Sequence, residues 1–170
     1  MEHQIVLIRG NSGSGKTTTA QLVQKTLGHG VMLLGQDVLR RELLYVPDGP
    51  DTPALGLLIA LAEYGRAHCA MVILEGILHA DWYRPLFRRI AELYPPQAIH
   101  AYYYDLPFAE TLRRHAGKPN AGDFGEAEMR RWWSSRDFIG SIPEMPIGPE
   151  VSQREAAAEI IAALGGTSDN

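Results

Sequence analysis

Residues 5–17 read Ile-Val-Leu-Ile-Arg-Gly-Asn-Ser-Gly-Ser-Gly-Lys-Thr. From Gly10 to Thr17 this stretch matches the pattern G-x-x-x-x-G-K-[S/T] at every defined position. The apolar run before it is typical of a strand buried on both faces, and apolar residues at helical spacing follow as far as Leu27. A strand, a glycine-rich turn and a helix in this order predict a phosphate-binding loop at the edge of an α/β sheet.

The positions of this loop have different predicted tasks. Glycines allow successive backbone N–H groups to turn inward around an anion, and the start of the helix adds positive potential. Lys16 is expected to reach the outer phosphates, and the Thr17 hydroxyl is expected to bind Mg²⁺. The sequence therefore predicts ATP and Mg²⁺ as ligands, whereas Thr19 is expected on the helix surface. The predicted nucleotide-binding residues are Gly10, Asn11, Ser12, Gly13, Ser14, Gly15, Lys16, Thr17 and Thr18.

The rest of the chain alternates apolar runs with segments of helical spacing. Such alternation predicts a parallel sheet with helices on both faces, and residues 1–170 fit a single domain. Asp105 is expected to cap the helix after the fourth strand, with Pro107 in its first turn. The tail 165–170 is expected to fray. Further strands are predicted at 31–34, 71–74, 98–104 and, weakly, 141–148, and further helices at 38–44, 54–68, 82–94, 105–115, 126–138 and 152–164.

Asp37, Glu75 and Asp105 follow the second, third and fourth predicted strands, at the edge where ligands bind in parallel sheets. Asp37 can accept the proton of a hydroxyl that attacks the terminal phosphate, although capping of the next helix also explains it. Arg40 or Arg41, one helical turn further on, can hold the acceptor. Glu75 can support the Mg²⁺ shell or orient the acceptor, and the alternative is a strand terminator.

The segment of about 113–136 combines arginines with glycines and is predicted to form a mobile helical lid. Arg113 and Arg114 follow the fourth strand by about two helical turns, so they are the predicted lid residues that neutralise the transferred phosphoryl group. The alternative is a pair of amphipathic helices with solvated basic faces.

Several other residues receive structural interpretations. Asp48 and Asp51 are interpreted as solvated charges of a proline-rich loop. The Trp132-Trp133 pair indicates packing, with stacking on a substrate ring as the alternative. His115 is assigned a surface role or a structural role in the lid.

Composition narrows the possible partners and the compartment. The net charge is −4 and no long basic stripe is present, which disfavours a nucleic-acid substrate. The single cysteine, Cys69, and the absence of a signal peptide favour a cytoplasmic location. The longest apolar stretch, Ala54–Ala62, is too short to cross a membrane. No guanine-recognition signature is evident, so ATP is favoured over GTP.

Four motifs together resemble a known family. These are the loop Gly10–Thr17, Gln36-Asp37-x-x-Arg40-Arg41, Leu74-Glu75-Gly76, and the stretch from Tyr104 to His115. The chain resembles the adenylate-kinase-like P-loop kinases, and within them it is most similar to the group of chloramphenicol phosphotransferase, zeta toxins and polynucleotide 5′-kinases.

This resemblance has implications for fold and site. It implies a three-layer P-loop sandwich with five parallel strands in the order 2-3-1-4-5. It also implies that Asp37 is the catalytic base, that Arg40 or Arg41 holds the acceptor, and that lid arginines such as Arg113 and Arg114 clamp the phosphates. Residues 147–153 resemble the loop that borders adenine.

Three functional hypotheses remain open from the sequence. The leading one is a kinase that transfers the γ-phosphate of ATP to a hydroxyl of a small molecule. The second is a polynucleotide or nucleotide-sugar kinase, and the third is an ATP-binding regulatory switch without an acceptor. Acceptor identity and oligomeric state are not encoded in any motif of the sequence.

Overall fold

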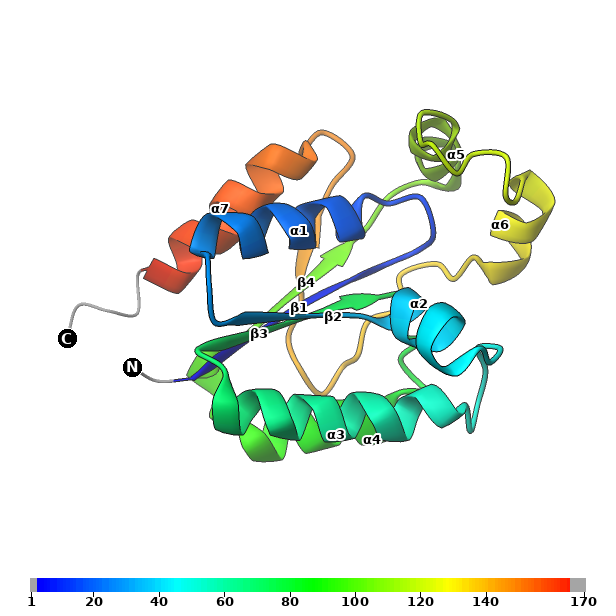
Figure 1. Ribbon diagram of the computed structural model, residues 1–170. Helices are drawn as coiled ribbons and strands as arrows, with labels where there is room; N and C mark the ends of the chain where they lie inside the picture. The colour runs from blue at the N-terminus through cyan, green and yellow to red at the C-terminus, as the bar shows by residue number, and fades with distance from the viewer. Residues whose placement is uncertain (1–2, 166–170) are drawn as a thin grey trace.

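The computed structural model describes residues 3–165. Its centre is a five-stranded parallel sheet in the order β2-β3-β1-β4-β5, which confirms the expected fold (Figure 1). The strands are β1 Gln4–Gly10, β2 Val31–Gly35, β3 Met71–Gly76, β4 Ile99–Tyr104 and β5 Met145–Ile147.

Strand β1 lies in the middle of the sheet because its apolar run serves both hydrophobic cores. Ile5 and Leu7 belong to the core on one face, whereas Val6 and Ile8 belong to the core on the other face. All four side chains are fully buried. A strand with β3 on one side and β4 on the other has no solvent-facing edge, so a continuous apolar run is the stable choice there.

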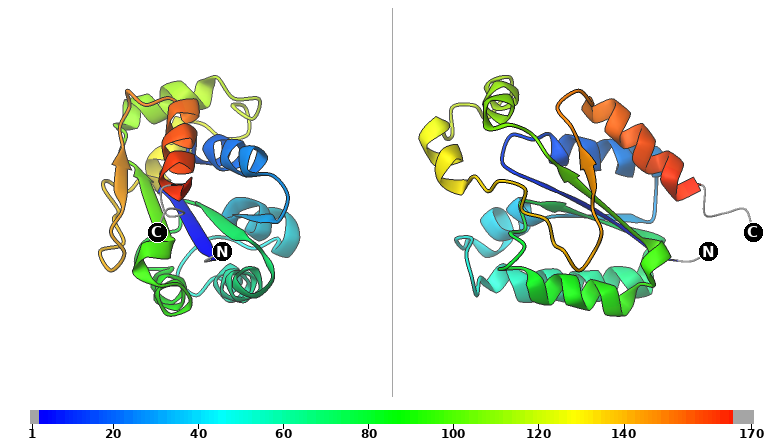
Figure 2. Two further views of the ribbon diagram at one scale, coloured as in Figure 1. Left: turned by 90° about the vertical axis from the view of Figure 1, so that its left-hand side faces the viewer. Right: turned by 180° about the vertical axis from the view of Figure 1, so that it is seen from behind.

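Helices cover both faces of the sheet. Figures 1 and 2 show α1 and α7 on one face, α3 and α4 on the other, and α5 and α6 beyond the carboxyl ends of the strands. No helix of residues 3–165 is long and apolar enough to cross a membrane. The helices are α1 Lys16–Leu27, α2 Gln36–Val38, the π-helix η1 Leu39–Leu44, α3 Pro53–His68, α4 Arg84–Leu93, the 3₁₀ helix η2 Pro96–Ala98, α5 Phe108–Ala116, α6 Glu126–Trp132 and α7 Gln153–Gly165.

The prediction of one helix from 126 to 138 was wrong, because α6 ends at Trp132. The backbone of Ser134 is captured by the Asn11 side chain, which accepts from its N–H at 2.9 Å and donates to its carbonyl at 2.7 Å. Further along, Asp137 is bound by the buried Arg9. Tertiary hydrogen bonds therefore replace helical ones and lead the chain past the P-loop towards β5.

Other element boundaries differ for local reasons. Asp105 does not cap α5, whose N-cap is Pro107; its carboxylate instead lies 3.4 Å from Nε of Arg136. The helix predicted over 38–44 begins earlier, as α2, and continues as a π-helix. Thr19 is not on the surface: it is fully buried, and its hydroxyl lies 2.5 Å from that of Tyr104. The predicted fraying of the tail concerns residues that, from 166 onward, lie outside the described residues.

Candidate active site at the carboxyl edge of the sheet

The P-loop lies between β1 and α1 and is packed tightly from outside. Gly13 and Gly15 have φ angles of +80° and +99°, a conformation that side-chain-bearing residues rarely adopt. A Cβ at Gly13 would lie 2.6 Å from the carbonyl oxygen of Thr111 in α5. A Cβ at Gly15 would lie 2.7 Å from the side chain of Gln153 at the start of α7. Glycine is therefore favoured at both positions for two reasons: the backbone angles are unusual for other residues, and a side chain would collide with neighbouring atoms.

Three side chains at the start of α1 and the end of β3 form the polar centre of the site. Nζ of Lys16 folds back over the loop and donates to the carbonyl of Asn11 at 3.2 Å. The Thr17 hydroxyl donates to Oε2 of Glu75 at 3.1 Å. Glu75 is buried, and this burial raises its pKa, while Lys16 and the Thr17 hydrogen bond oppose the shift.

The donor atoms at Thr17 and Glu75 are those that Mg²⁺ requires. Both are oxygens, and Mg²⁺ is usually held by one or two carboxylates together with waters and substrate phosphates. Within residues 3–165, no cluster of three or more His, Cys, Asp or Glu side chains could hold a metal ion by itself. The residues thus fit a Mg²⁺ ion that arrives with a phosphate ligand, and the metal-binding role of Thr17 and Glu75 stays a prediction.

Asp37 lies at the start of α2, directly after β2, and is paired with both predicted arginines. Nη2 of Arg40 donates to its Oδ1 at 3.0 Å, and Nε of Arg41 lies 3.9 Å from the same oxygen. The Arg40 side chain is 13% exposed and the Arg41 side chain 47%, so Arg40 is the inner of the two. Nε of Arg40 is buried, and no hydrogen-bond partner for it lies among residues 3–165.

The interpretation of Asp48 as a solvated loop charge was wrong. Its Oδ1 accepts from the Tyr83 hydroxyl at 2.7 Å and its Oδ2 accepts from Nε2 of Gln36 at 2.9 Å. Nε2 of Gln36 also donates to the Tyr83 hydroxyl at 2.8 Å. Burial, followed by the hydrogen bond to Asp48, raises the pKa of Tyr83, so this hydroxyl stays protonated and donating. Asp51, in contrast, is exposed.

The two predicted lid arginines have different surroundings. Arg113 is 72% exposed and pairs with Glu110 at 2.6 Å, so the structure does not bring it to the P-loop. Arg114 is 8% exposed and donates to the carbonyl of Ser14 at 2.8 Å, while a second ion pair joins it to Glu110. It also donates to the carbonyl of Pro149, in the segment predicted to border adenine. Arg114 therefore holds lid, P-loop and this segment together.

Lys118, in the segment predicted as the lid, lies close enough to Lys16 and Glu75 to interact with both electrostatically. It is half-buried. Burial, together with the charges of Lys16 and Arg114, lowers its pKa, and the Glu75 carboxylate opposes this effect. Positive groups gathered without sufficient anions indicate a site for an anionic ligand.

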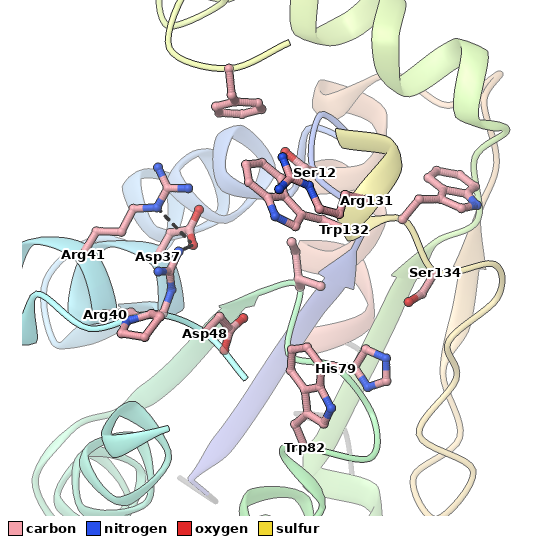
Figure 3. A pocket seen from close by; sticks show the side chains of 14 residues that line it. Ser12, Asp37, Arg40, Arg41, Asp48, His79, Trp82, Arg131, Trp132 and Ser134 are labelled. Carbon is pink, nitrogen blue, oxygen red and sulfur yellow. Dashed lines mark hydrogen bonds and ion pairs between the residues drawn. The ribbon is translucent and has the colours of Figure 1, made fainter. Parts of the chain in front are cut away.

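A cavity of about 450 Å³ opens beside these groups. Figure 3 shows its walls: α2 and η1 contribute the arginines and Asp37, the segment after β3 contributes His79 and Trp82, and the lid contributes Trp132. The P-loop contributes Ser12, so the phosphate loop and Asp37 line the same cavity. Its full lining is Ser12, Asp37, Arg40, Arg41, Pro47, Asp48, Ile77, His79, Trp82, Phe124, Arg131, Trp132, Trp133 and Ser134.

Solved structures of two kinases and of an antibiotic resistance protein share this architecture. A gluconokinase from Sinorhizobium meliloti has a TM-score of 0.69 at 17% identity, over 97% of this chain and 93% of that one. The APS kinase of Mycobacterium tuberculosis, in complex with AMPPNP and APS, has a TM-score of 0.65 at 23% identity, over 96% and 98%. The tunicamycin resistance protein of Deinococcus radiodurans has a TM-score of 0.63 at 16% identity, over 95% and 96%.

This chain has the fold of the small P-loop kinases. No protein-family model matches it, and no curated protein matches it in sequence. The narrower resemblance to the group of chloramphenicol phosphotransferase, zeta toxins and polynucleotide 5′-kinases stays a prediction.

Within this P-loop kinase fold, the structure separates the predicted site residues into two sets. The loop Gly10–Thr17, Asp37, Arg40, Arg41 and Glu75 converge at the carboxyl edge of the sheet, and Thr18 follows the loop in the first turn of α1, whereas Arg113 faces solvent. Asn11 is also in place, but its side chain is engaged by Ser134.

Sequence reasoning missed the residues that the lid and the loops bring to the site. Lys118 has a weak signal, since it is one of only three lysines in a chain that otherwise uses arginine. No sequence pattern identifies Phe124 or Trp82 as site residues, because an aromatic residue in a loop or at a helix start is usually explained by packing. Their role depends on contacts between distant segments.

Proposed function

We propose that this protein is an ATP-dependent phosphotransferase that moves the terminal phosphate of ATP onto a hydroxyl group of a small molecule. The observation that carries the proposal is that Ser12 of the P-loop and Asp37 line one cavity. A phosphate held by the loop and a hydroxyl held near Asp37 would therefore meet in a shared space. The kinase fold of the chain is consistent with this activity.

The proposed transfer assigns one task to each group. The acceptor oxygen attacks the terminal phosphorus, its proton passes to the Asp37 carboxylate, and the bond from that phosphorus to the bridging oxygen breaks to release ADP. Lys16 and Lys118 hold and neutralise the phosphate oxygens. Thr17 and Glu75 would hold Mg²⁺, which when bound neutralises further phosphate charge.

The position of Asp37 beside the cavity suits it to the role of base, although its carboxylate is paired with two arginines. Its carboxylate is directed by the inner Arg40 and the outer Arg41, and its side chain is 59% exposed on the cavity side of α2. An exposed carboxylate can receive a proton from a bound hydroxyl and pass it to water afterwards.

A phosphate-transfer screen tests the proposal. The protein is incubated with γ-labelled ATP, Mg²⁺ and a panel of nucleosides, sugars, antibiotics and 5′-hydroxyl oligonucleotides. Wild type is expected to label at least one small acceptor, and Asp37→Asn is expected to lose this transfer by about a hundredfold or more while still binding ATP. Asp51→Asn, an equal change in the exposed loop before α3, is the matched control and should retain transfer.

The screen also separates the remaining hypotheses. Labelled oligonucleotides alone would replace the proposal by the polynucleotide reading. Hydrolysis of ATP at the same rate in wild type and Asp37→Asn, with no labelled acceptor, would leave a nucleotide switch and reject the kinase. The net charge of −4 argues for the small-molecule outcome.

A further inference from the structure

The cavity beside Asp37 carries more aromatic surface than the proposed chemistry requires. Trp82 and Trp132 both line it, yet 36% and 38% of these residues remain exposed. Phe124 and His79 line it as well. Large aromatic side chains that gather in a hollow, with faces left uncovered, indicate a place where a ligand supplies the missing contact.

These rings are held in place from behind. Trp82 stacks on His79 with centroids 4.5 Å apart and planes 20° apart. Phe124 stacks on His115 at 4.4 Å and 19°, and Trp132 meets the edge of Phe124 at 5.2 Å. His115 is buried and hydrogen-bonded to the carbonyl of Phe124 at 2.9 Å, so it fixes this lid pair. Preorganised rings lose little conformational entropy when a ligand binds.

The two tryptophans come from opposite walls of the cavity. Figure 3 shows Trp132 of the lid on one side and Trp82, beside His79, on the other, with Asp37 and Asp48 on a third side. That third side carries the only carboxylates of the lining, and Asp48 is already satisfied there by Gln36 and Tyr83, whereas Arg131 lies beside Trp132. A molecule that binds here thus meets aromatic faces on two sides and the base on another.

We propose that the acceptor contains a flat, conjugated ring, which packs against Trp132 and Trp82 and presents an attached hydroxyl group to Asp37. The inference rests on the proposed kinase function, because it names the acceptor class of the same site. A ringless polyol could bind the polar lining residues but would leave the exposed faces of the two tryptophans without a matching apolar surface. A ring gains from offset or edge contacts with each tryptophan.

Matched ligand pairs test this inference. Uridine is compared with methyl riboside, which has a similar set of hydroxyl groups without the base, and 1-phenylpropane-1,3-diol is compared with propane-1,3-diol. Binding is measured by calorimetry in the presence of Mg²⁺ and a non-hydrolysable ATP analogue, and transfer is measured separately with γ-labelled ATP. At least one ring-bearing compound is expected to bind about tenfold or more tightly than its ringless partner.

Variants locate the contact. Trp132→Leu and Trp82→Leu are expected to weaken binding of the ring-bearing compound by about tenfold, and Trp132→Phe, which keeps a ring, is expected to recover most of this loss. Tyr64→Leu is the matched control, because Tyr64 is an aromatic residue of α3 that is 57% exposed and does not line the cavity. Circular dichroism confirms that each variant is folded.

The outcomes for the two proposals are distinguishable. Equal binding of both members of every pair, or ring selectivity that survives both leucine variants, overturns the ring inference even if sugars are phosphorylated. Ring-selective binding that is lost in Trp132→Leu, without transfer to any compound, supports the ring site and counts against the kinase. Ring-selective binding together with transfer supports both.

Discussion

The donor side and the acceptor side of this site are built in opposite ways. The P-loop is a continuous stretch whose neighbours leave no room for change: Ser14 is fully buried, and Gly13 faces the backbone of α5. The acceptor cavity takes its walls from three segments besides the P-loop residue Ser12, and its tryptophans remain partly exposed. The donor side is thus a rigid site for a constant ligand, whereas the acceptor side is an open surface that loop sequence can alter.

This contrast agrees with the solved structures of the same fold. Their names include a gluconokinase, an APS kinase and a shikimate kinase, so similar scaffolds carry different acceptors. Variation of function on a constant scaffold is expected when the variable residues lie in loops at one edge of the sheet. The following four predictions test how sharply the two sides differ.

The largest effect is expected at the rigid centre of the donor side. Lys16→Ala removes the ammonium group that lies over the loop, and ATP turnover is expected to fall by at least a hundredfold with the fold intact. Steady-state kinetics and circular dichroism check both parts. Lys25→Ala, at the exposed end of α1, is the control. Near-normal affinity and turnover in Lys16→Ala would remove the phosphate-binding assignment.

The second test concerns the buried Arg9, because it connects the strand before the P-loop to segments next to the acceptor cavity. Its guanidinium donates to Glu144 at 2.8 Å and to Asp137 at 2.9 Å, and it also binds the carbonyl of Leu78. Arg9→Leu would leave Glu144 buried without its partner, which costs about 3–5 kcal/mol of unfolding free energy. Arg89→Leu breaks exposed ion pairs instead, so a far smaller loss of unfolding free energy is expected.

Urea unfolding of both variants measures this difference. Similar losses of unfolding free energy in the two variants would show that the buried ion pairs of Arg9 stabilise the protein no more than exposed ones do. The expected result is that the contacts of Arg9, which connect the P-loop strand to the segment after the lid, contribute far more to the free energy of unfolding than the surface ion pairs of Arg89.

The third test concerns the lid. Lys118→Ala is expected to reduce transfer about tenfold, since one phosphate-facing cation is lost. Arg113→Ala is the matched control, because Arg113 belongs to the same lid but points to solvent, and no change is expected. Initial rates at saturating acceptor measure both. A larger loss in Arg113→Ala than in Lys118→Ala would favour the original sequence-based assignment.

The smallest effect is a gain in stability at Glu75. Burial raises its pKa in the folded protein, so its charged form costs folding free energy at neutral pH. Glu75→Gln is expected to raise the melting temperature of the nucleotide-free protein by roughly 2–4 °C, which corresponds to about 1 kcal/mol. Mg²⁺-dependent turnover is expected to fall in the same variant.

The stabilising effect of Glu75→Gln is expected to depend on pH. Below the ordinary pKa of a glutamate both forms of the protein are neutral at this position, so the two melting temperatures should agree. The difference between the melting temperatures of wild type and Glu75→Gln should increase as the pH rises through the raised pKa of Glu75. Thermal melts at about pH 4, below the ordinary glutamate pKa, and at pH 8 test this, with the exposed Glu92→Gln as control. A gap that does not widen with pH would contradict the assignment.

Much of the fold could be predicted because the apolar pattern of each strand is local. The run in β1 and the Gly10–Thr17 motif identify the P-loop, and the strand-helix alternation, read with the family resemblance, led to the order of the sheet. Predictions failed where distant contacts overruled local propensity. Asn11 and Arg9 bind the backbone after Trp132 and end α6 early, and Tyr104 buries Thr19.

The sequence by itself determined the phosphate cradle and the carboxylates that face it, since glycine angles, a lysine and strand-end acids act within one or two neighbouring elements. Only the tertiary structure decided which cations meet that cradle, that Asp48 is bound rather than solvated, and that Trp82 and Trp132 share a cavity. The reason is physical: these groups come from segments far apart in the chain, and their distances depend on how the helices pack on the sheet.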